Sequence, residues 1–278
     1  MKTKFLFLFL VSHFVYSQIW VNSLDDAKDV AKASGKFILI DFNASWCGPC
    51  KVMDREFFHN AKYKTTLDKF ILVSIDVDRN TNLAQYYSIR TLPNIKLVDV
   101  NGGVIYESSG FDSAEDSNTE FAGFPESSGD LYEKLNLKNK KKPTDEELLN
   151  IATSYQILLQ KSQNKARNQF LKHSNNFFDK CIKNTFNTNY KEISELGKLF
   201  NLALTDSGDK VIKKLNISKI SNENKSYAYY ILAKANYSND NSDEAEKNIL
   251  EIEKLNNEEW ISAGKVLKAK YNQKKNKK

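Results

Sequence analysis

The sequence of 278 residues predicts an α/β domain, with a mixed central sheet covered by helices, followed by an all-α region. The N-terminal half alternates β-rich and helical stretches and ends in a hairpin signal. The C-terminal half is helical in pattern almost throughout. The charge also divides: residues 18–137 carry 12 basic and 18 acidic side chains, whereas residues 138–278 carry 27 and 17. Such asymmetry is typical of two separately evolved surfaces.

Short apolar runs are the strand signals of the N-terminal half. Phe37 to Phe42 is apolar except for Asp41, which is typical of a central strand buried on both faces. Asn101-Gly102 is a turn signal between the last two strands. Ser23 and Gly35 are the start and stop signals of the first helix. We expect strands at 37–42, 70–76, 95–100 and 104–106, and helices at 23–35, 51–58, 81–87 and 130–137.

Two charged segments lie between the regular elements. The stretch 110–123 is acidic and turn-prone, so we expect a surface insertion in or beside the last strand. Lys138 to Pro143 is a basic linker, and Thr144 with Glu147 forms a capping box that predicts a helix start. The expected division is a signal peptide at 1–17, a first domain at 18–137, the linker at 138–143 and a helical domain at 144–278.

One stretch of the helical half resembles a tetratricopeptide repeat. Between Ala228 and Asn256, small residues stand where paired helices touch, and Glu244-Ala245 matches the opening of the second helix. The resemblance implies a tetratricopeptide-like helical domain that binds partners, and a plain helical bundle with no binding role is the alternative. Further helices are expected, without a clean period, at 145–160, 165–184, 189–204, 208–215 and 258–271.

The N-terminus has the pattern of a secretory signal peptide. Lys2 and Lys4 form a basic lead, an apolar run extends from Phe5 to Tyr16, and Val15 and Ser17 have the spacing of small residues before a cleavage site. An uncleaved anchor is the alternative, but a bilayer span needs roughly 20 apolar residues, more than this run provides. We therefore expect an exported protein that begins at Gln18 after cleavage.

Two of the three cysteines form Cys47-Gly48-Pro49-Cys50, where a predicted strand turns into a helix. At that position the first cysteine meets the unpaired N–H groups and the positive dipole end of the helix, which favour thiolate over thiol. The second lies one helical turn along, within disulfide reach. Cys47 can therefore attack a substrate disulfide, and Cys50 can resolve the mixed disulfide. Half of a zinc site and an inert structural disulfide are the alternatives.

The other candidate metal ligands are scattered. A zinc site would need two ligands beyond the cysteine pair, and only Cys181, His59 and His173 remain after export, with no second paired spacing. We therefore expect no metal. Cys181 lies in an apolar helical stretch and is expected to be buried core rather than a redox group. His59 is expected to be a surface residue rather than an acid–base group.

Two motifs carry a resemblance to a known family. Ile40 to Lys51 resembles the active-site strand and turn of thioredoxins, and Ile89 to Pro93 resembles their cis-proline loop at the family's distance. Together they cover most of residues 19–137. The opening at Trp20 and the stretch Cys50 to Asp54 are similar to a bacterial envelope subgroup, which includes the periplasmic domains of thiol-reductant transporters. The resemblance implies a thioredoxin fold and a protein-disulfide reductase that needs no cofactor.

The same resemblance implies the roles of the thiols and of one carboxyl. Cys47 would be the nucleophile and Cys50 the resolving thiol. Asp41 matches the buried carboxylate that accepts the proton of Cys50, and desolvation in its apolar strand should raise its pKa. The alternative for Asp41 is an ordinary carboxylate at a strand edge.

Substrate-binding roles follow from the resemblance as well. Pro93 matches the cis-proline opposite the disulfide, where it keeps metal away. With Thr91 and Leu92 it would form the loop whose backbone, at Leu92, pairs with an extended substrate segment. Trp46 would flank the cysteines, and the alternative is a surface aromatic with no energetic role.

The sequence departs from the family at two positions. Ser74 stands where many thioredoxins have a lysine beside the buried carboxylate, so proton handling should differ. Asn43 stands where an aromatic residue is common. Asn43-Ala44-Ser45 is also a glycosylation sequon beside the active site, which would be damaging in a eukaryotic secretory pathway and therefore favours a bacterial envelope.

These observations predict an enzyme that reduces disulfides of exported proteins in a bacterial periplasm or cell envelope. The Gly-Pro dipeptide favours reduction, although the potential also depends on other groups. The expected partners are disulfide-bearing exported proteins, an upstream membrane thiol reductant and, for the basic half, an acidic protein or anionic envelope surface, with no nucleic acid. The alternative is a client-binding helical-repeat adaptor with a vestigial or oxidase/isomerase-type thioredoxin domain.

Overall fold

The first half of the chain forms a five-stranded mixed sheet, as predicted. The structure is a computed structural model that describes residues 19–135 and 142–276. The sheet has the order β1-β3-β2-β4-β5, in which β1, β3 and β2 run parallel and β4 and β5 run antiparallel to their neighbours. Its strands are β1 (Ile19–Val21), β2 (Phe37–Asn43), β3 (Phe70–Asp76), β4 (Asn94–Val98) and β5 (Val104–Ser109).

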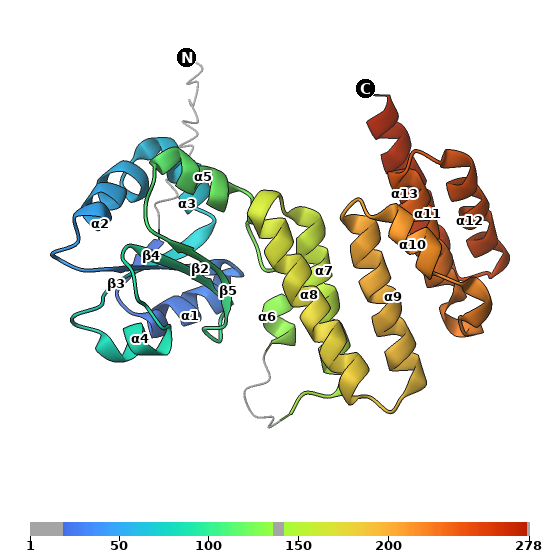
Figure 1. The fold of residues 1–278 in the computed structure, drawn as a ribbon, viewed down its shortest axis with the longest axis horizontal. Helices are drawn as coiled ribbons and strands as arrows, with labels where there is room; N and C mark the ends of the chain where they lie inside the picture. The colour runs from blue at the N-terminus through green and yellow to red at the C-terminus, as the bar shows by residue number, and fades with distance from the viewer. Residues whose placement is uncertain (1–18, 136–141, 277–278) are drawn as a thin grey trace, which may run out of the picture.

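Helices cover both faces of this sheet, with α1 and α4 on one face and α2, α3 and α5 on the other (Figure 1). Ser23 caps α1 by accepting the N–H of Asp26, and Gly35 ends it in the left-handed region, as the sequence predicted. A π-helical turn at Asp54–Phe58 continues α2. The helices are α1 (Leu24–Ser34), α2 (Gly48–Met53), α3 (Lys64–Leu67), α4 (Thr81–Tyr86), α5 (Ala114–Ala122) and α6 (Leu131–Lys134), with a 3-10 turn at Ala61–Tyr63.

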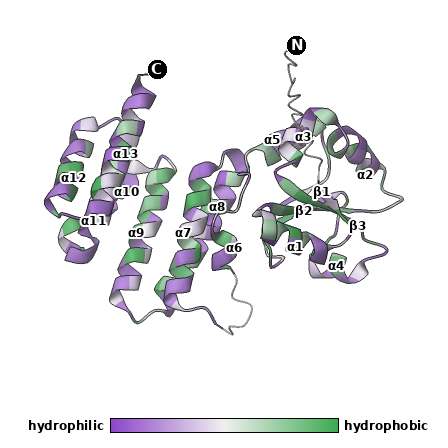
Figure 2. Ribbon diagram, turned by 180° about the vertical axis from the view of Figure 1, so that it is seen from behind, coloured by the Kyte–Doolittle hydropathy of each residue, from purple (hydrophilic) through white to green (hydrophobic). Residues whose placement is uncertain are grey.

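Strand β2 is the buried centre of the sheet. It pairs with β3 on one side and β4 on the other, and every residue from Phe37 to Phe42 is buried. The sheet is the most hydrophobic layer of the first half of the chain, as the green colour of its strands shows in Figure 2. The prediction of a central strand is therefore confirmed, and the position of its C-terminal end is fixed by ladders on both sides.

The second half is helical, as predicted. Thr144 and Glu147 form the expected capping box at the start of α7. α11 and α12 form a helical hairpin whose contacts include the fully buried Ala233 and Ala245, and α13 packs against both helices. The resemblance of this hairpin to a tetratricopeptide repeat stays a prediction. The helices are α7 (Asp145–Lys161), α8 (Asn164–Asn184), α9 (Thr188–Leu204), α10 (Gly208–Lys214), α11 (Lys225–Ser238), α12 (Ser242–Lys254) and α13 (Glu258–Lys275), with 3-10 turns at Ile217–Lys219 and Asn222–Asn224.

The two halves share one hydrophobic core. Phe170 of α8 is fully buried, and its ring lies 5.9 Å from that of Phe37, at the start of β2, and 5.8 Å from that of Phe124. The backbone N–H of Gln163 donates to the carbonyl oxygen of Gly123 at 3.0 Å. Because α8 packs at the start of β2, the end of that strand on which α2 begins stays clear of the helical half (Figure 1).

The segment 110–123 is not a surface insertion, so that expectation is wrong. Residues Ala114–Ala122 form α5, which begins where Ser113 accepts the N–H of Asp116. Phe121 of this helix is fully buried, and its ring contacts those of Phe57 and Phe70. Glu115 and Asp116 are exposed, whereas Glu120 is largely covered and pairs with Lys165 of α8. The acidic sequence therefore hides the aromatic anchor that makes α5 a core element.

Some expectations fall outside the described residues. These are the signal peptide at 1–17 and most of the linker at 138–143. The expected helix at 130–137 is observed at Leu131–Lys134. Within the described ranges, no helix has the length and apolar character needed to cross a bilayer.

The shared core predicts that α8 stabilises the sheet. Phe170→Ala should lower the free energy of unfolding by about 3–5 kcal/mol, since it removes a fully buried ring. Phe186→Ala, at a fully exposed phenylalanine, is the matched control and should change it by less than about 0.5 kcal/mol. Urea denaturation followed by circular dichroism measures both. Equal effects of the two substitutions would contradict a common core.

Candidate functional site

The cysteine pair lies at the junction between the end of β2 and the start of α2. Cys47 and Cys50 form a disulfide with 5.3 Å between their Cα atoms. Cys47 is the N-cap residue of α2, and its Sγ accepts the backbone N–H of Cys50 at 3.2 Å. Pro49 lies in the first helical turn, where its missing N–H costs no hydrogen bond. The helix therefore directs an N–H group at the sulfur of the first cysteine, and such a group stabilises a thiolate.

Both cysteine residues are largely covered. Cys47 is 4% exposed and Cys50 7% exposed, and Leu92 and Val77 pack against them. The Leu92-Pro93 peptide bond is cis, as the resemblance implied. Since β4 pairs with β2 only from Asn94 onward, Leu92 and Thr91 lie outside the sheet ladder, at the side of the disulfide.

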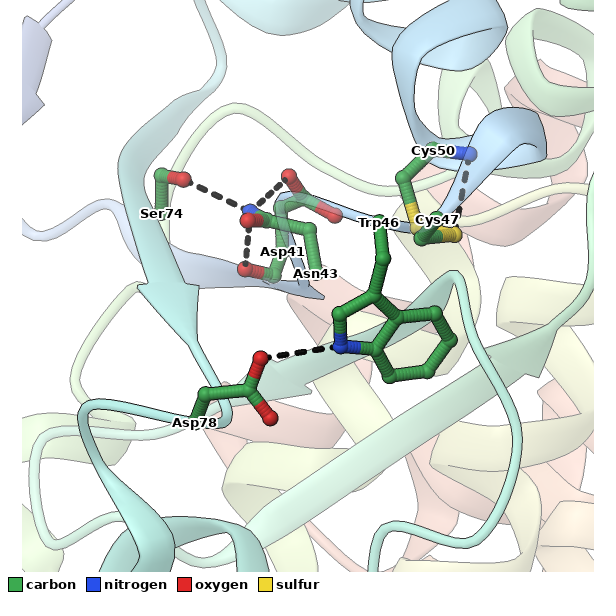
Figure 3. Close-up of a disulfide and its surroundings, with 7 residues drawn as sticks. All are labelled: Asp41, Asn43, Trp46, Cys47, Cys50, Ser74 and Asp78. Carbon is green, nitrogen blue, oxygen red and sulfur yellow. Dashed lines mark hydrogen bonds between the residues drawn. A yellow bond between two sulfur atoms is a disulfide. The ribbon is translucent and has the colours of Figure 1, made fainter.

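A groove of about 460 Å³ runs beside the disulfide. Its lining includes Trp46, Ile89 and Leu92, together with residues of α4. Trp46 is 68% exposed, and its indole N–H donates to Asp78 at 2.9 Å (Figure 3). This hydrogen bond favours one orientation of the exposed ring. The groove and its exposed aromatic rim offer an extended segment a place to bind.

Asp41 lies near the C-terminal end of β2, in a small polar network. The side-chain N–H₂ of Asn43 donates to the Asp41 carboxylate at 2.8 Å and to the Ser74 hydroxyl at 2.7 Å (Figure 3). Asp41 and Ser74 are direct partners in the β2–β3 ladder, and Asn43 lies two residues along, on the same face. Asn43 therefore serves as the polar partner of the carboxyl and joins it to Ser74.

Burial raises the pKa of Asp41 to about 7 from an ordinary 3.8. The hydrogen bond from Asn43 opposes this shift, and the negative charge of Asp54 adds to it. Asp41 is 6% exposed, which makes desolvation of its charged form the main cause. A carboxyl with this pKa can both accept and release a proton near neutral pH, as a general base for a thiol must.

The structure brings most of the predicted site residues together. Cys47, Cys50 and Leu92 are in contact, Trp46 borders the groove that Leu92 also lines, and Asp41 lies in β2, the strand that precedes α2. Thr91 is exposed at the start of the cis-proline loop. The roles assigned to these residues stay predictions.

Sequence reasoning missed Asn43 and Asp78 as parts of the site. Asn43 was noted only as a departure from the family, although its spacing from Asp41 places the two side chains on one face of a strand. Asp78 contacts Trp46 across 32 residues of sequence, so no local pattern could have indicated it.

The remaining titratable candidates lie apart from the disulfide. Cys181 is a fully buried free cysteine of α8, as predicted. His59 is a surface residue, as predicted, and its ring stacks on Trp20 and approaches the Asp54 carboxylate to 3.0 Å. Across 19–135 and 142–276, no three His, Cys, Asp or Glu side chains gather as a metal site would require.

Comparison with known proteins decides the family. A thioredoxin-like family profile matches residues 19–99. Thioredoxin of Gallus gallus is 35% identical over 94 residues, which are 32% of this chain and 83% of the chicken protein. The chain belongs to the thioredoxin family. This thioredoxin-family chain, with its Cys47–Cys50 pair, is a thiol–disulfide oxidoreductase.

Two further proteins that match this chain are also named for disulfide chemistry. The thiol:disulfide interchange protein DsbD of Vibrio cholerae is 31% identical over 86 residues, which are 30% of this chain but only 14% of that protein. The solved structure of a disulphide isomerase from Xylella fastidiosa is 30% identical, with a TM-score of 0.33, and the match covers 36% of this chain and 86% of that one. Most of this thioredoxin-family chain is therefore left unmatched by these relatives.

The raised pKa of Asp41 predicts how stability depends on pH. The folded chain keeps a proton on Asp41 that the unfolded chain loses above about pH 4, so the free energy of unfolding should fall between about pH 4 and pH 7 and then level off. Asp41→Asn removes this dependence and should stabilise the oxidised protein by up to about 4 kcal/mol at about pH 8, with little change near pH 4. Denaturation at a series of pH values measures it.

The matched control is Asp112→Asn, at an exposed carboxylate. It should leave the pH profile unchanged. The same Asp41→Asn protein should resolve a mixed disulfide more slowly than the parent, because Cys50 has lost its proton acceptor. A pH profile of unfolding that is the same with and without Asp41 would show that its carboxyl titrates normally.

Proposed function

We propose that this thioredoxin-family chain is a reductase for disulfides of exported proteins in a bacterial envelope. One observation carries the proposal: a Gly-Pro pair stands between two cysteines, of which the first caps a helix. The helix N-terminus favours the thiolate of Cys47, which is the attacking form of the thiol. The reductive direction is proposed from the Gly-Pro dipeptide between the cysteines.

The proposed reaction transfers two electrons from the cysteine pair to the client. The Cys47 thiolate attacks one sulfur of the client disulfide, and the other client sulfur leaves as a thiolate. Asp41 accepts the proton of Cys50, whose sulfur then attacks Sγ of Cys47 and displaces the second client thiolate. The client is left as a dithiol and the enzyme as the Cys47–Cys50 disulfide. A thiol reductant must then return two electrons.

The groove beside the disulfide supports an extended client segment. Trp46 and Leu92 line it, and the backbone at Leu92, next to the cis-proline, lies outside the sheet ladder and can pair with a client strand. We assign the substrate contacts to Trp46, Thr91, Leu92 and Pro93 on this basis.

Export and an envelope reductant complete the proposal. Its support is the basic, apolar and small-residue order at the N-terminus and the similarity to DsbD of Vibrio cholerae, whose name describes thiol:disulfide interchange. An exported thioredoxin needs a source of electrons outside the cytoplasm, so the proposal includes an upstream membrane thiol reductant.

A reductive role predicts a low reduction potential. Equilibration of the full chain with glutathione buffers should give a potential nearer to the roughly −270 mV of thioredoxin than to the roughly −120 mV of an oxidant such as DsbA. The reduced protein should also reduce insulin, and Cys47→Ser should not. A potential above about −180 mV would assign an oxidase or isomerase role instead.

The export proposal predicts a mature chain that begins at Gln18. Intact-mass measurement of the protein from the envelope fraction of a bacterial host should show the loss of residues 1–17. Ser17→Trp, which places a large residue at the cleavage site, should leave the leader attached. A full-length product in the cytoplasm would refute both export and the proposed clients.

A further inference from the structure

A second groove lies in the helical half, far from the disulfide. It has a volume of about 380 Å³ and is formed by the C-terminal end of α9 together with α11 and α13, with Gln160 of α7 and Arg167 of α8 also in its lining. α2 and α13 lie at opposite ends of the molecule (Figure 1), so the groove is separate from the redox site. Nothing in the proposed reaction uses it.

The groove is strongly cationic. Its lining contains five basic side chains, at Arg167, Lys234, Lys270, Lys274 and Lys275, against two carboxylates. Among the described residues, none of the five makes a salt bridge with a carboxylate. Arg167 instead donates to the carbonyl oxygen of Leu204 at the end of α9. The five basic side chains therefore outnumber the two carboxylates of the groove, Asp206 and Asp240, and leave it with a net positive charge.

The cations crowd one another around Lys234. This side chain is part-buried on α11, and burial lowers its pKa. Asp206 opposes the shift, whereas Lys274, Arg167 and Lys270 add to it. Like charges gathered around a part-buried lysine repel it, and a bound anion would relieve that repulsion.

Aromatic side chains form an apolar part of the same groove. Tyr237 and Tyr271 both line it, and their rings stack with 4.3 Å between centroids. The Tyr237 hydroxyl is buried and has no hydrogen-bond partner in the described part of the chain. Buried hydroxyl groups are normally paired, so this one is a polar group at the groove wall that lacks a partner.

We propose that this groove, lined by Arg167, Lys234 and Lys270 and by stacked tyrosines, binds an acidic peptide segment of a partner protein. The lysines suit carboxylates as point charges, and the tyrosine rings suit an apolar side chain next to them. The volume is that of a site for a few residues. Asp206 and Asp240 in the lining would repel a dense polyanion, whereas a segment with one or two carboxylates can avoid them.

The binding does not depend on the redox pair. Anchoring at one end of the chain would hold a client or a reductant while the disulfide works at the other end. The Cys47→Ser/Cys50→Ser protein should therefore bind the segment with unchanged affinity, even if the proposed reductase function fails.

Fluorescence anisotropy with the full chain tests the proposal. The probe is a labelled hexapeptide with two Glu and one Leu, and its Gln counterpart is the control peptide. We expect Lys270→Glu/Lys274→Glu to weaken binding of the Glu peptide by about five- to thirtyfold, and added salt to weaken it too. Lys213→Glu/Lys214→Glu, an equal charge change on α10 outside the groove, should change the affinity by less than about twofold.

Several outcomes would overturn the proposal. Equal loss in the two double variants would assign binding to net charge alone. Equal affinity for the Gln peptide would show that carboxylates are not what the groove recognises. Tighter, competing binding of inorganic polyphosphate would make the ligand a polyanion. Self-association of the unlabelled chain through these lysines would make the partner a second copy. Since Lys270 and Lys274 are exposed, their variants should fold. As an independent check, Lys234→Met should weaken binding of the same Glu peptide.

Discussion

The chemistry of this chain depends on one junction, at which buried strand β2 ends and helix α2 begins. β2 is fixed by hydrogen-bond ladders to β3 and β4, so the first residues of α2 have little freedom. The Cys50 N–H points at the Cys47 sulfur because Cys47 occupies the N-cap position. The sheet thereby sets the position of the Cys47 sulfur. Leu92 of the cis-proline loop packs against the two cysteines, and Trp46 lines the adjacent groove. The asymmetry between two nearly adjacent cysteines is thus a property of the backbone.

The same strand sets the acid–base group. Within the described residues, the contact that lowers the pKa of Asp41 is the hydrogen bond from the Asn43 amide. Burial outweighs it, so desolvation decides the pKa of Asp41. A lysine at Ser74 would lower that pKa by favouring the charged carboxylate. The two departures from the family, Asn43 and Ser74, therefore belong together: they form one neutral polar network in place of an ion pair. At the other end of β2, Phe37 packs against Phe170, so the helical half supports the strand without reaching the disulfide.

Local patterns predicted much of this arrangement, and tertiary contacts account for what they missed. The Ser23 cap, the buried run from Phe37, the cysteine pair and the helical segments are encoded within a few residues, and each is observed. β1 was not predicted because a three-residue strand exists only through its pairing with β3. α5 was mistaken for an insertion because its acidic face is visible in the sequence, whereas the aromatic cluster that buries Phe121 is assembled from distant elements. Local sequence patterns could likewise not predict the Trp46–Asp78 hydrogen bond or the cationic groove, since each joins residues that are far apart in sequence.

The central claim is that the helix start makes Cys47, and not Cys50, the reactive thiol. Its most direct test is alkylation of the fully reduced, full-length chain with iodoacetamide over a range of mildly acidic to neutral pH, with each cysteine quantified by peptide mass. The account predicts that Cys47 is labelled first and reaches its half-maximal rate at a lower pH than Cys50, while the buried Cys181 is labelled last. Faster labelling of Cys50 than of Cys47 at mildly acidic pH would contradict it.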